Sequence, residues 1–374
     1  MSTCRKTDYD PDWREKYKDM IMTAEEAVAN IRPGQRIFIA TGGAQPLRLI
    51  KALVDRHADL ADTQVISSLT LGEAPYALKD LADYFSVNTF FISANVREMI
   101  QEGYGDYTPI AFSDIPRLFS SGRLPLDVAL IQVTPPDLMG RCSLGISVDI
   151  VKSAAANAGL VIAQVSPQMP WTCGDSLVNI LDLDILVPVD EPLVETAYHG
   201  FIDDVTTGAW AEDPTGVIKA IGENVASLVE DGSTIEIGIG RIPHAVAAHL
   251  REKKDLGIHT ELVTDVIIPL VESGAVTGSQ KSLDRGKIVT SFALGTRKLY
   301  EYVDNNPLFS FNPTEYVNDP FVIGRQNKMV AINTALEVDL TGQVCSDSLG
   351  TKFYSGIGGQ HDFNEGAGRS PGGR

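Results

Sequence analysis

Residues 25–39 read EEAVANIRPGQRIFI and residues 223–237 read ENVASLVEDGSTIEI, so two similar segments begin 198 residues apart. Each has the pattern of a short amphipathic helix, a turn with glycine at the same place (Gly34 or Gly232), and a β-branched strand. A repeat of a whole helix–turn–strand segment indicates that the chain contains two related units in tandem.

The surroundings of the two segments repeat as well. After each strand come glycines and a proline, TGGAQP in residues 41–46 and GIGRIP in residues 238–243, and a helical pattern follows each time. A second pair of segments, DLMGRCS in residues 137–143 and DLTGQVCS in residues 339–346, begins 202 residues apart and follows an apolar run in both cases. Two matches in the same order and nearly the same register favour duplication over chance.

Short apolar runs alternate with helical patterns along the chain, which is typical of a parallel α/β sheet. The strand candidates are RIFIA (36–40), QVISSL (64–69), NTFFISA (88–94), DVALIQV (127–133), GLVIAQV (159–165) and DILVPV (184–189). Thr23 and Glu26 fit a capping box at the start of the first helix. Proline, glycine and acidic residues break the pattern in residues 190–214, where we predict the domain boundary, and residues 216–229 then open the second unit as an amphipathic helix. The sequence therefore predicts two tandem, related, open α/β domains, residues 1–200 and 214–374.

Composition narrows the classes of partner. The 374 residues are 44% hydrophobic and carry a formal net charge of −18 without a Lys/Arg-rich run, so nucleic acid is a poor candidate partner. An acidic surface does not steer an anionic ligand, which must instead meet local donors. The charged N-terminus does not resemble a signal peptide, and 18 uninterrupted apolar residues occur nowhere. The four scattered cysteines favour reduced thiols in the cytoplasm, and the His and Cys spacing does not predict a metal site.

Three turns of the second unit are candidates for chemistry, because ligands of parallel sheets bind beyond the strand ends. Residues 238–243, GIGRIP, fit a ligand approaching the main chain but equally fit a structural turn. Glu261 is a candidate nucleophile or base, against the simpler reading of a solvated loop acid. Residues 355–363, SGIGGQHDF, could aim main-chain N–H groups at a developing oxyanion, or be a flexible loop.

Together these motifs resemble the acetyl-CoA hydrolase/transferase family of class I CoA transferases. The likeness spans nearly the whole chain and is most specific in GIHTELVTD (257–265), YVNDP (316–320), MVAINTALEVDLTGQVCSDSLGT (329–351) and FYSGIGGQHDF (353–363). It implies two CoA-transferase-like domains related to the NagB type of fold. Members of the family continue for tens of residues past the GGQ-x-D-F loop, so the resemblance also implies that residues 214–374 are truncated at their C-terminus.

The resemblance assigns roles to residues at matching positions. Glu261 would be the catalytic nucleophile, Gly359 the oxyanion-hole glycine, and Asn318 the residue that positions the nucleophile and the thioester. The implied CoA-binding and substrate-binding residues are Gly238, Gly240, Arg241, Ile242, Gly356, Gly358 and Gln360. Coenzyme A would enter as a substrate, with no permanently bound cofactor, and the implied partners are an acyl-CoA, a short carboxylic acid and a second copy of the chain in a homodimer.

The implied reaction is transfer of CoA from acetyl-CoA to 4-hydroxybutyrate or a similar acid, by a ping-pong route through an acyl-glutamyl anhydride and a glutamyl-CoA thioester. A glutamate with the ordinary pKa near 4.3 is ionised at pH 7 and needs no base. Three alternatives stay open at this point. The chain could be an acetyl-CoA hydrolase that uses the same Glu261, it could be a catalytically impaired CoA-binding protein, or, more weakly, Cys345 could be the nucleophile.

Overall fold

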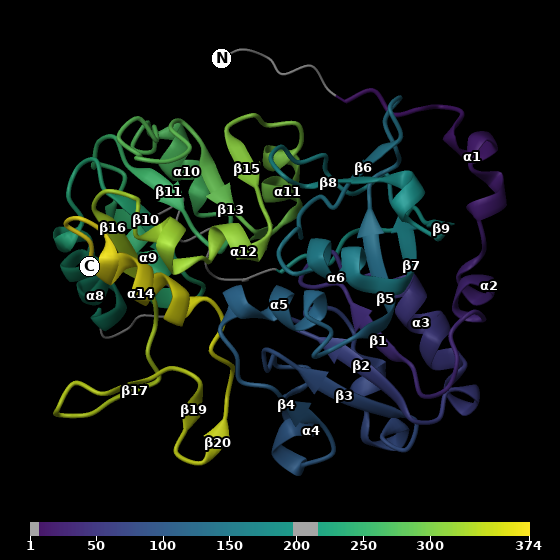
Figure 1. Cartoon of the computed structure of the whole chain (residues 1–374). Helices are drawn as coiled ribbons and strands as arrows, with labels where there is room; N and C mark the ends of the chain where they lie inside the picture. The colour runs from purple at the N-terminus through teal and green to yellow at the C-terminus, as the bar shows by residue number, and fades with distance from the viewer. Residues whose placement is uncertain (1–6, 197–215) are drawn as a thin grey trace.

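The computed structural model describes residues 7–196 and 216–374, and it contains two parallel β-sheets in separate halves of the sequence (Figure 1). The first sheet has the order β4-β3-β2-β1-β5-β7-β9, with strands β1 (Arg36–Ile39), β2 (Thr63–Ser67), β3 (Phe85–Thr89), β4 (Asp106–Tyr107), β5 (Leu126–Val133), β7 (Ala158–Val165) and β9 (Ile185–Pro188). The second has the order β15-β13-β11-β10-β16, with strands β10 (Thr234–Ile237), β11 (Gly257–His259), β13 (Ile288–Thr290), β15 (Phe309–Phe311) and β16 (Met329–Ile332). The predicted α/β class is therefore confirmed.

The order of strands confirms the duplication. In the first sheet β1 lies between β2 and β5, and in the second β10 lies between β11 and β16, so β4-β3-β2-β1-β5 corresponds to β15-β13-β11-β10-β16. The turn glycines repeat the backbone conformation too, because Gly34 has a φ of 76° and Gly232 a φ of 75°. A left-handed conformation of this kind is costly for residues with a Cβ, which explains why glycine stands in both turns.

Helices connect the strands and cover the sheets (Figure 1). In the first half they are α1 (Trp13–Lys16), α2 (Ala24–Val28), α3 (Leu47–Asp55), α4 (Arg97–Glu102), α5 (Ile115–Ser120) and α6 (Val151–Asn157). In the second half they are α8 (Val217–Leu228), α9 (Arg241–His249), α10 (Ile267–Glu272), α11 (Arg297–Val303), α12 (Thr314–Val317), α13 (Pro320–Ile323) and α14 (Gln360–Arg369). The predicted capping box is present, with Glu26 N–H donating to Thr23 Oγ1 and Thr23 N–H donating to Glu26 Oε2.

One predicted strand is displaced. The sequence pattern indicated a strand over residues 88–94, but β3 runs from Phe85 to Thr89 and pairs with β2 along that length. The chain leaves the sheet after Thr89, whose hydroxyl donates to the carbonyl of Phe91 at 2.8 Å. Aromatic residues 90 and 91 gave the run a strand-like pattern, yet Phe91 lines a pocket instead.

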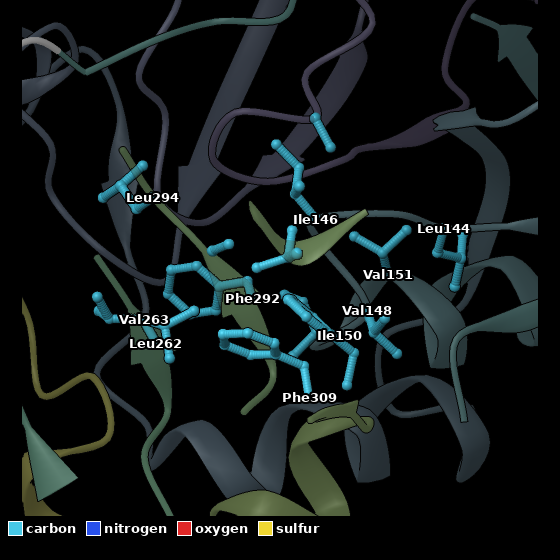
Figure 2. Packing of buried hydrophobic residues seen from close by; sticks show 14 of the residues in the cluster. Leu144, Ile146, Val148, Ile150, Val151, Leu262, Val263, Phe292, Leu294 and Phe309 are labelled. Atoms are coloured by element: carbon cyan, nitrogen blue, oxygen red, sulfur yellow. The ribbon is translucent and has the colours of Figure 1, made fainter. Parts of the chain in front are cut away.

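A shared hydrophobic core joins the two halves. Figure 2 shows Ile146, Val148 and Ile150 of the first half packed against Phe292 and Phe309 of the second. Main-chain bonds cross the same boundary, since the N–H of residue 293 donates to Ile146 O at 2.8 Å and that of Val148 donates to the carbonyl of residue 291 at 3.1 Å. The short pair β12 (Leu262–Val263) and β14 (Phe292–Ala293) is therefore held directly against the first half.

Small antiparallel elements complete the chain. They are the pair β6 (Arg141–Ser143) with β8 (Leu177–Asn179), the hairpin β17 (Glu337–Val338) with β18 (Val344–Cys345), and the hairpin β19 (Ser348–Leu349) with β20 (Lys352–Phe353). The last two hairpins form an arm that projects from the body before α14 (Figure 1). Most of the predicted domain boundary, residues 197–214, lies outside the described residues, so the exact domain limits stay a prediction.

Candidate active site

Glu261 lies just beyond the end of β11, the central strand of the second sheet. Strands β10 and β11 run parallel, with Thr234 opposite Gly257, so their carboxyl ends meet at one edge, where parallel sheets bind ligands. Glu261 follows β11 as the chain passes into β12. Its own carbonyl accepts from the N–H of residue 291 at 2.9 Å and from Thr290 Oγ1 at 3.1 Å. These bonds fix the main chain on which the carboxylate is mounted.

The two other predicted catalytic residues lie against this carboxylate. Asn318, fully buried just after α12, donates from Nδ2 to Glu261 Oε2 at 2.8 Å. Gly359, just before α14, comes so close that a Cβ there would lie 1.8 Å from Glu261 Oε2 and 2.5 Å from Asn318 Nδ2. Only glycine fits at this position. The structure thus brings Glu261, Asn318 and Gly359 together, while their catalytic roles stay predictions.

Two residues that the sequence interpretation did not single out complete this cluster. Asp362, in the first turn of α14, accepts from Ser113 N–H at 3.0 Å and from Ser113 Oγ at 2.8 Å, and Ser113 belongs to the first half of the chain. Asn318 Nδ2 lies 3.5 Å from Asp362 Oδ2, so its amide faces both carboxylates. Asp362 stands only three residues after Gly359, in the same motif, whereas nothing in the local sequence around Ser113 marks it.

Glu261 lines a pocket with a volume of about 160 Å³. It is lined from both halves, by Ser68, Leu69, Phe91, Phe112, Glu236, Gly238, Ile239, Glu261, Leu262, Phe292, Asn333, Thr334, Ser346, Ser355, Gly356, Ile357, Gly358, Gly359 and Gln360. The exposed surface of this lining is mainly apolar, with a few polar groups from several elements, and such a combination is usual for small-molecule sites.

The predicted binding residues fall into two groups. Gly238, Gly356, Gly358 and Gln360 line the pocket. Gly240, Arg241 and Ile242 are outside that lining and lie where α9 begins, with Gly240 at its N-cap and Ile242 packed against the core. The GIGRIP turn therefore lines the pocket with its first two residues and then leads into α9.

Burial raises the pKa of Glu261 to about 8. The nearby carboxylates Asp362 and Asp149 raise this pKa further, and the hydrogen bond from Asn318 partly lowers it. The expectation of an ordinary glutamate pKa near 4.3 is therefore wrong for this site. The reason is tertiary, because the local sequence shows neither the burial nor the two distant carboxylates.

Glu236 is a second buried carboxyl in the same pocket, and the sequence interpretation missed it. It lies in β10, is only 4% exposed, and accepts at Oε2 from Ile332 N–H at 3.1 Å and from Asn333 Nδ2 at 2.9 Å. Burial and the charge of Glu261 raise its pKa to about 8. A signal was available, since Glu236 is the only charged residue in the apolar strand pattern TIEI.

His259 holds the main chain next to Asn318 by a hydrogen bond. Its Nε2 lies 2.8 Å from the carbonyl of Val317, and because a carbonyl only accepts, this nitrogen carries the hydrogen. Burial, together with the positive charge of Lys281, lowers the pKa of His259 to about 4, so the ring is neutral at pH 7. The bond fixes the residue that precedes Asn318, and thereby helps to orient the amide.

Three further features were sought in the part of the chain that the structure describes: a cysteine nucleophile, a metal-binding cluster and a membrane-spanning helix. Cys345 contacts Asp347 and Ser348 and is not among the pocket-lining residues. Residues 7–196 and 216–374 include no cluster of three or more His, Cys, Asp or Glu side chains arranged to hold a metal ion. Within the same ranges, no helix combines the length and apolar character needed to cross a membrane.

Comparison with known proteins agrees with this architecture. The chain matches the family model of the acetyl-CoA hydrolase/transferase N-terminal domain over residues 1–196 and that of the C-terminal domain over residues 295–374. It is 42% identical to the 4-hydroxybutyrate coenzyme A transferase of Clostridium kluyveri, over 97% of this chain and 82% of that protein. It is 43% identical to the succinyl-CoA:acetate/propanoyl-CoA:succinate CoA transferase of Fasciola hepatica, over 92% of this chain and 69% of that protein.

A solved structure gives the same result. The 4-hydroxybutyrate CoA-transferase of Porphyromonas gingivalis superimposes with a TM-score of 0.80 at 35% identity, over 96% of this chain and 81% of that one. The two family models, the identity along nearly the whole chain and the shared fold agree with each other. The chain therefore belongs to the acetyl-CoA hydrolase/transferase family and is an enzyme of the CoA-transferase class.

Proposed function

We propose that this enzyme transfers CoA from acetyl-CoA to 4-hydroxybutyrate or a similar short carboxylic acid, with Glu261 as the covalent nucleophile. The observation that carries the proposal is the contact of three groups, namely a half-buried carboxylate that lines the pocket, a buried amide that donates to it at 2.8 Å, and a glycine main chain against which no side chain fits. The names of the relatives in Clostridium kluyveri and Porphyromonas gingivalis support 4-hydroxybutyrate as the acid.

The chemistry follows from the carboxylate. Glu261 attacks the thioester carbonyl, the carbon–sulfur bond breaks, and an acyl-glutamyl anhydride and CoA thiolate result. The thiolate then attacks the carbonyl carbon of Glu261, which releases the first acid as a carboxylate and leaves glutamyl-CoA. A second carboxylate runs these steps in reverse and leaves as its CoA thioester.

The surrounding groups suit these steps. Each attack passes through a tetrahedral oxyanion, and we assign its donor to the N–H of Gly359, the residue packed against Glu261; losing one such donor typically costs about 3 kcal/mol. Asn318 holds Glu261 in one orientation. The largely apolar lining limits water, which would otherwise hydrolyse the anhydride and turn the transferase into a hydrolase.

Covalent labelling tests the nucleophile. We expect incubation with acetyl-CoA, followed by borohydride reduction or hydroxylamine treatment and peptide mass analysis, to modify the peptide that contains Glu261. Glu261→Gln should remove the modification and lower transfer by about 10³-fold or more, because a neutral amide is not a nucleophile. An active wild-type preparation in which Glu261 stays unmodified would contradict the mechanism.

Acceptor comparison tests the substrate. We expect 4-hydroxybutyrate to give a higher kcat/KM than acetate, butyrate or succinate when acetyl-CoA is the donor. CoA release at the same rate without any added acid would instead identify a hydrolase. A link to acetate metabolism follows if acetate is the released acid, and the homodimer stays a prediction for light scattering to check.

A further inference from the structure

The position of Glu236 suits a catalytic residue as well as a structural one. Strands β16, β10 and β11 are neighbours, with Ile237 opposite Ile332 and Ile235 opposite Ile258. By this register Glu236 lies level with His259, two residues before Glu261 on the next strand, and side chains two residues apart share a face. Both carboxyls line the one pocket.

Gly238 leaves room beside Asn333 at the wall of the pocket. It follows the last residue of β10 and lines the pocket, and a Cβ there would come 3.0 Å from Asn333 Oδ1. A side chain at this position would therefore crowd the amide that donates to Glu236. Glycine leaves this pair undisturbed in the pocket that Glu261 also lines.

The hydrogen bonds of Glu236 leave one oxygen for a ligand. Both donors, Ile332 N–H and the Asn333 amide, bind Oε2, and both are neutral. If Glu236 carries a proton, that proton therefore belongs on Oε1. A protonated carboxyl whose second oxygen already accepts two bonds is a fixed hydrogen-bond donor, as in enzymes that keep a buried acid neutral at pH 7.

The proposed reaction never places more than one reacting negative charge in this pocket. In the free enzyme it is the Glu261 carboxylate, once this group has lost the proton that a pKa of about 8 leaves largely bound at pH 7. After the first attack it is the CoA thiolate, and in glutamyl-CoA it is the leaving or entering carboxylate. Like charges that share a low-polarity site cannot both persist, so at every stage the anion present favours the protonated form of Glu236.

We propose that Glu236 is a second catalytic carboxyl, which stays protonated through the cycle and donates a hydrogen bond from Oε1 to the anion, thiolate or carboxylate, that lies beside Glu261. This inference rests on the proposed function of Glu261. The competing explanation is that Glu236 is an ionised anchor, which only ties the end of β16 to β10 through its two accepted hydrogen bonds.

Apart from Glu261, the groups that we identify around Glu236 are uncharged, so they neither neutralise nor repel a charge on it. On the β11 side the titratable neighbours are Glu261 itself and His259, which is neutral at pH 7. The β16 side contributes Asn333 and Thr334, both neutral. The first half and the glycine loop contribute only uncharged lining residues, namely Ser68, Leu69, Phe91, Phe112, Ser355, Gly356, Ile357, Gly358, Gly359 and Gln360.

The two explanations predict opposite behaviour for Glu236→Gln. Glutamine reproduces a neutral acid, since its carbonyl accepts the two bonds and its NH₂ donates in place of the proton. We expect E236Q to lower kcat at pH 7 by severalfold less than Glu236→Leu does, and to remove the fall in kcat that ionisation of Glu236 should cause in wild type at high pH. Glu236→Leu, which has no donor, should lower kcat by roughly tenfold or more.

Each alternative outcome overturns the proposal. A folded E236Q that is inactive at every pH would mean that the ionised carboxylate is required. An unchanged fall at high pH would mean that another group titrates, and full activity of E236L would mean that no donor is needed. Glu252→Gln, an exposed carboxyl of the same half, is the matched control and should behave as wild type.

Infrared difference spectroscopy gives a readout that does not depend on turnover. Wild type minus E236Q at pH 7 should contain the carbonyl stretch of a protonated carboxylic acid, and its absence would overturn the proposal even in an inactive preparation. Failure of the proposed function looks different, because wild type would then transfer no CoA or leave Glu261 unlabelled while the infrared band could still be present.

Discussion

At the scale of single residues, Gly359 packs tightly against the Glu261 carboxyl. A Cβ at Gly359 would lie 1.8 Å from Glu261 Oε2 and 2.5 Å from Asn318 Nδ2, so a side chain there would displace the hydrogen-bonded pair that Asn318 and Glu261 form. We therefore expect this position to require glycine.

We predict that Gly359→Ala lowers kcat/KM by about 100-fold or more, because the loop that carries the oxyanion donor must move away from the nucleophile. Steady-state transfer kinetics with acetyl-CoA check this. The matched control is Gly368→Ala in α14, the helix that follows Gly359, where a Cβ meets nothing within 4 Å. That change should leave kinetics unaltered and stabilise the protein by roughly 0.5–1 kcal/mol. Wild-type kinetics in G359A would contradict the assignment.

At the scale of elements, α14 is held at its first turn by the other half of the molecule. Asp362 accepts two hydrogen bonds from Ser113, just before α5, and the same helix packs Phe363 into the core. Burial raises the pKa of Asp362 to about 6, so the carboxylate is ionised at pH 8, and hydrogen bonds to charged groups are the stronger kind. This contact aligns the glycine loop, which immediately precedes α14, with Glu261.

We predict that Ser113→Ala, which removes the hydroxyl donor and leaves the N–H, lowers the free energy of unfolding by about 1 kcal/mol at pH 8. The loss should be smaller at pH 5, where the carboxyl is largely protonated and its bond is weaker. Denaturant unfolding at both pH values measures this difference. Ser120→Ala, at an exposed position of α5, is the control. An equal loss at both pH values would show that Asp362 titrates outside this range.

At the scale of the whole molecule, the buried carboxyls make stability depend on pH. Glu236 and Glu261 each bind a proton more tightly in the folded chain than in the unfolded one, because their folded pKa values are about 8. Between about pH 4.5 and pH 8 the folded state therefore holds more protons, and the free energy of unfolding falls as pH rises. Above pH 8 both carboxyls are ionised in the folded site, where burial makes their charged forms less favourable than in water.

We predict that Glu261→Gln raises the melting temperature by roughly 2 °C or more at pH 8.5 and by less at pH 5. The variant removes a carboxyl that must ionise in a poorly solvated place, so the gain grows with pH. Differential scanning calorimetry across this range tests the prediction, with Glu252→Gln as the exposed control. A gain that is independent of pH would show that Glu261 titrates normally in the folded state.

The sequence by itself determined much of the architecture and pointed to the site. The repeat of helix, glycine turn and strand predicted two related α/β units, and glycine at 34 and 232 serves the same left-handed turn in each. The motifs around residues 261, 318 and 359 contain the three groups that the fold brings into contact. Such local signals persist in sequence because periodicity, turn chemistry and motif spacing are properties of neighbouring residues.

Only the tertiary structure decided how these groups are charged and which further residues surround them. Ser113 reaches Asp362 across 249 positions, and Glu236 meets Asn333 across 97. A pKa depends on the burial of a group and on every charge around it, whatever its distance along the chain, so the raised pKa values of Glu236 and Glu261 were not readable from either motif. The sequence identified the nucleophile that we propose, and the fold determined its pKa and the residues that surround it.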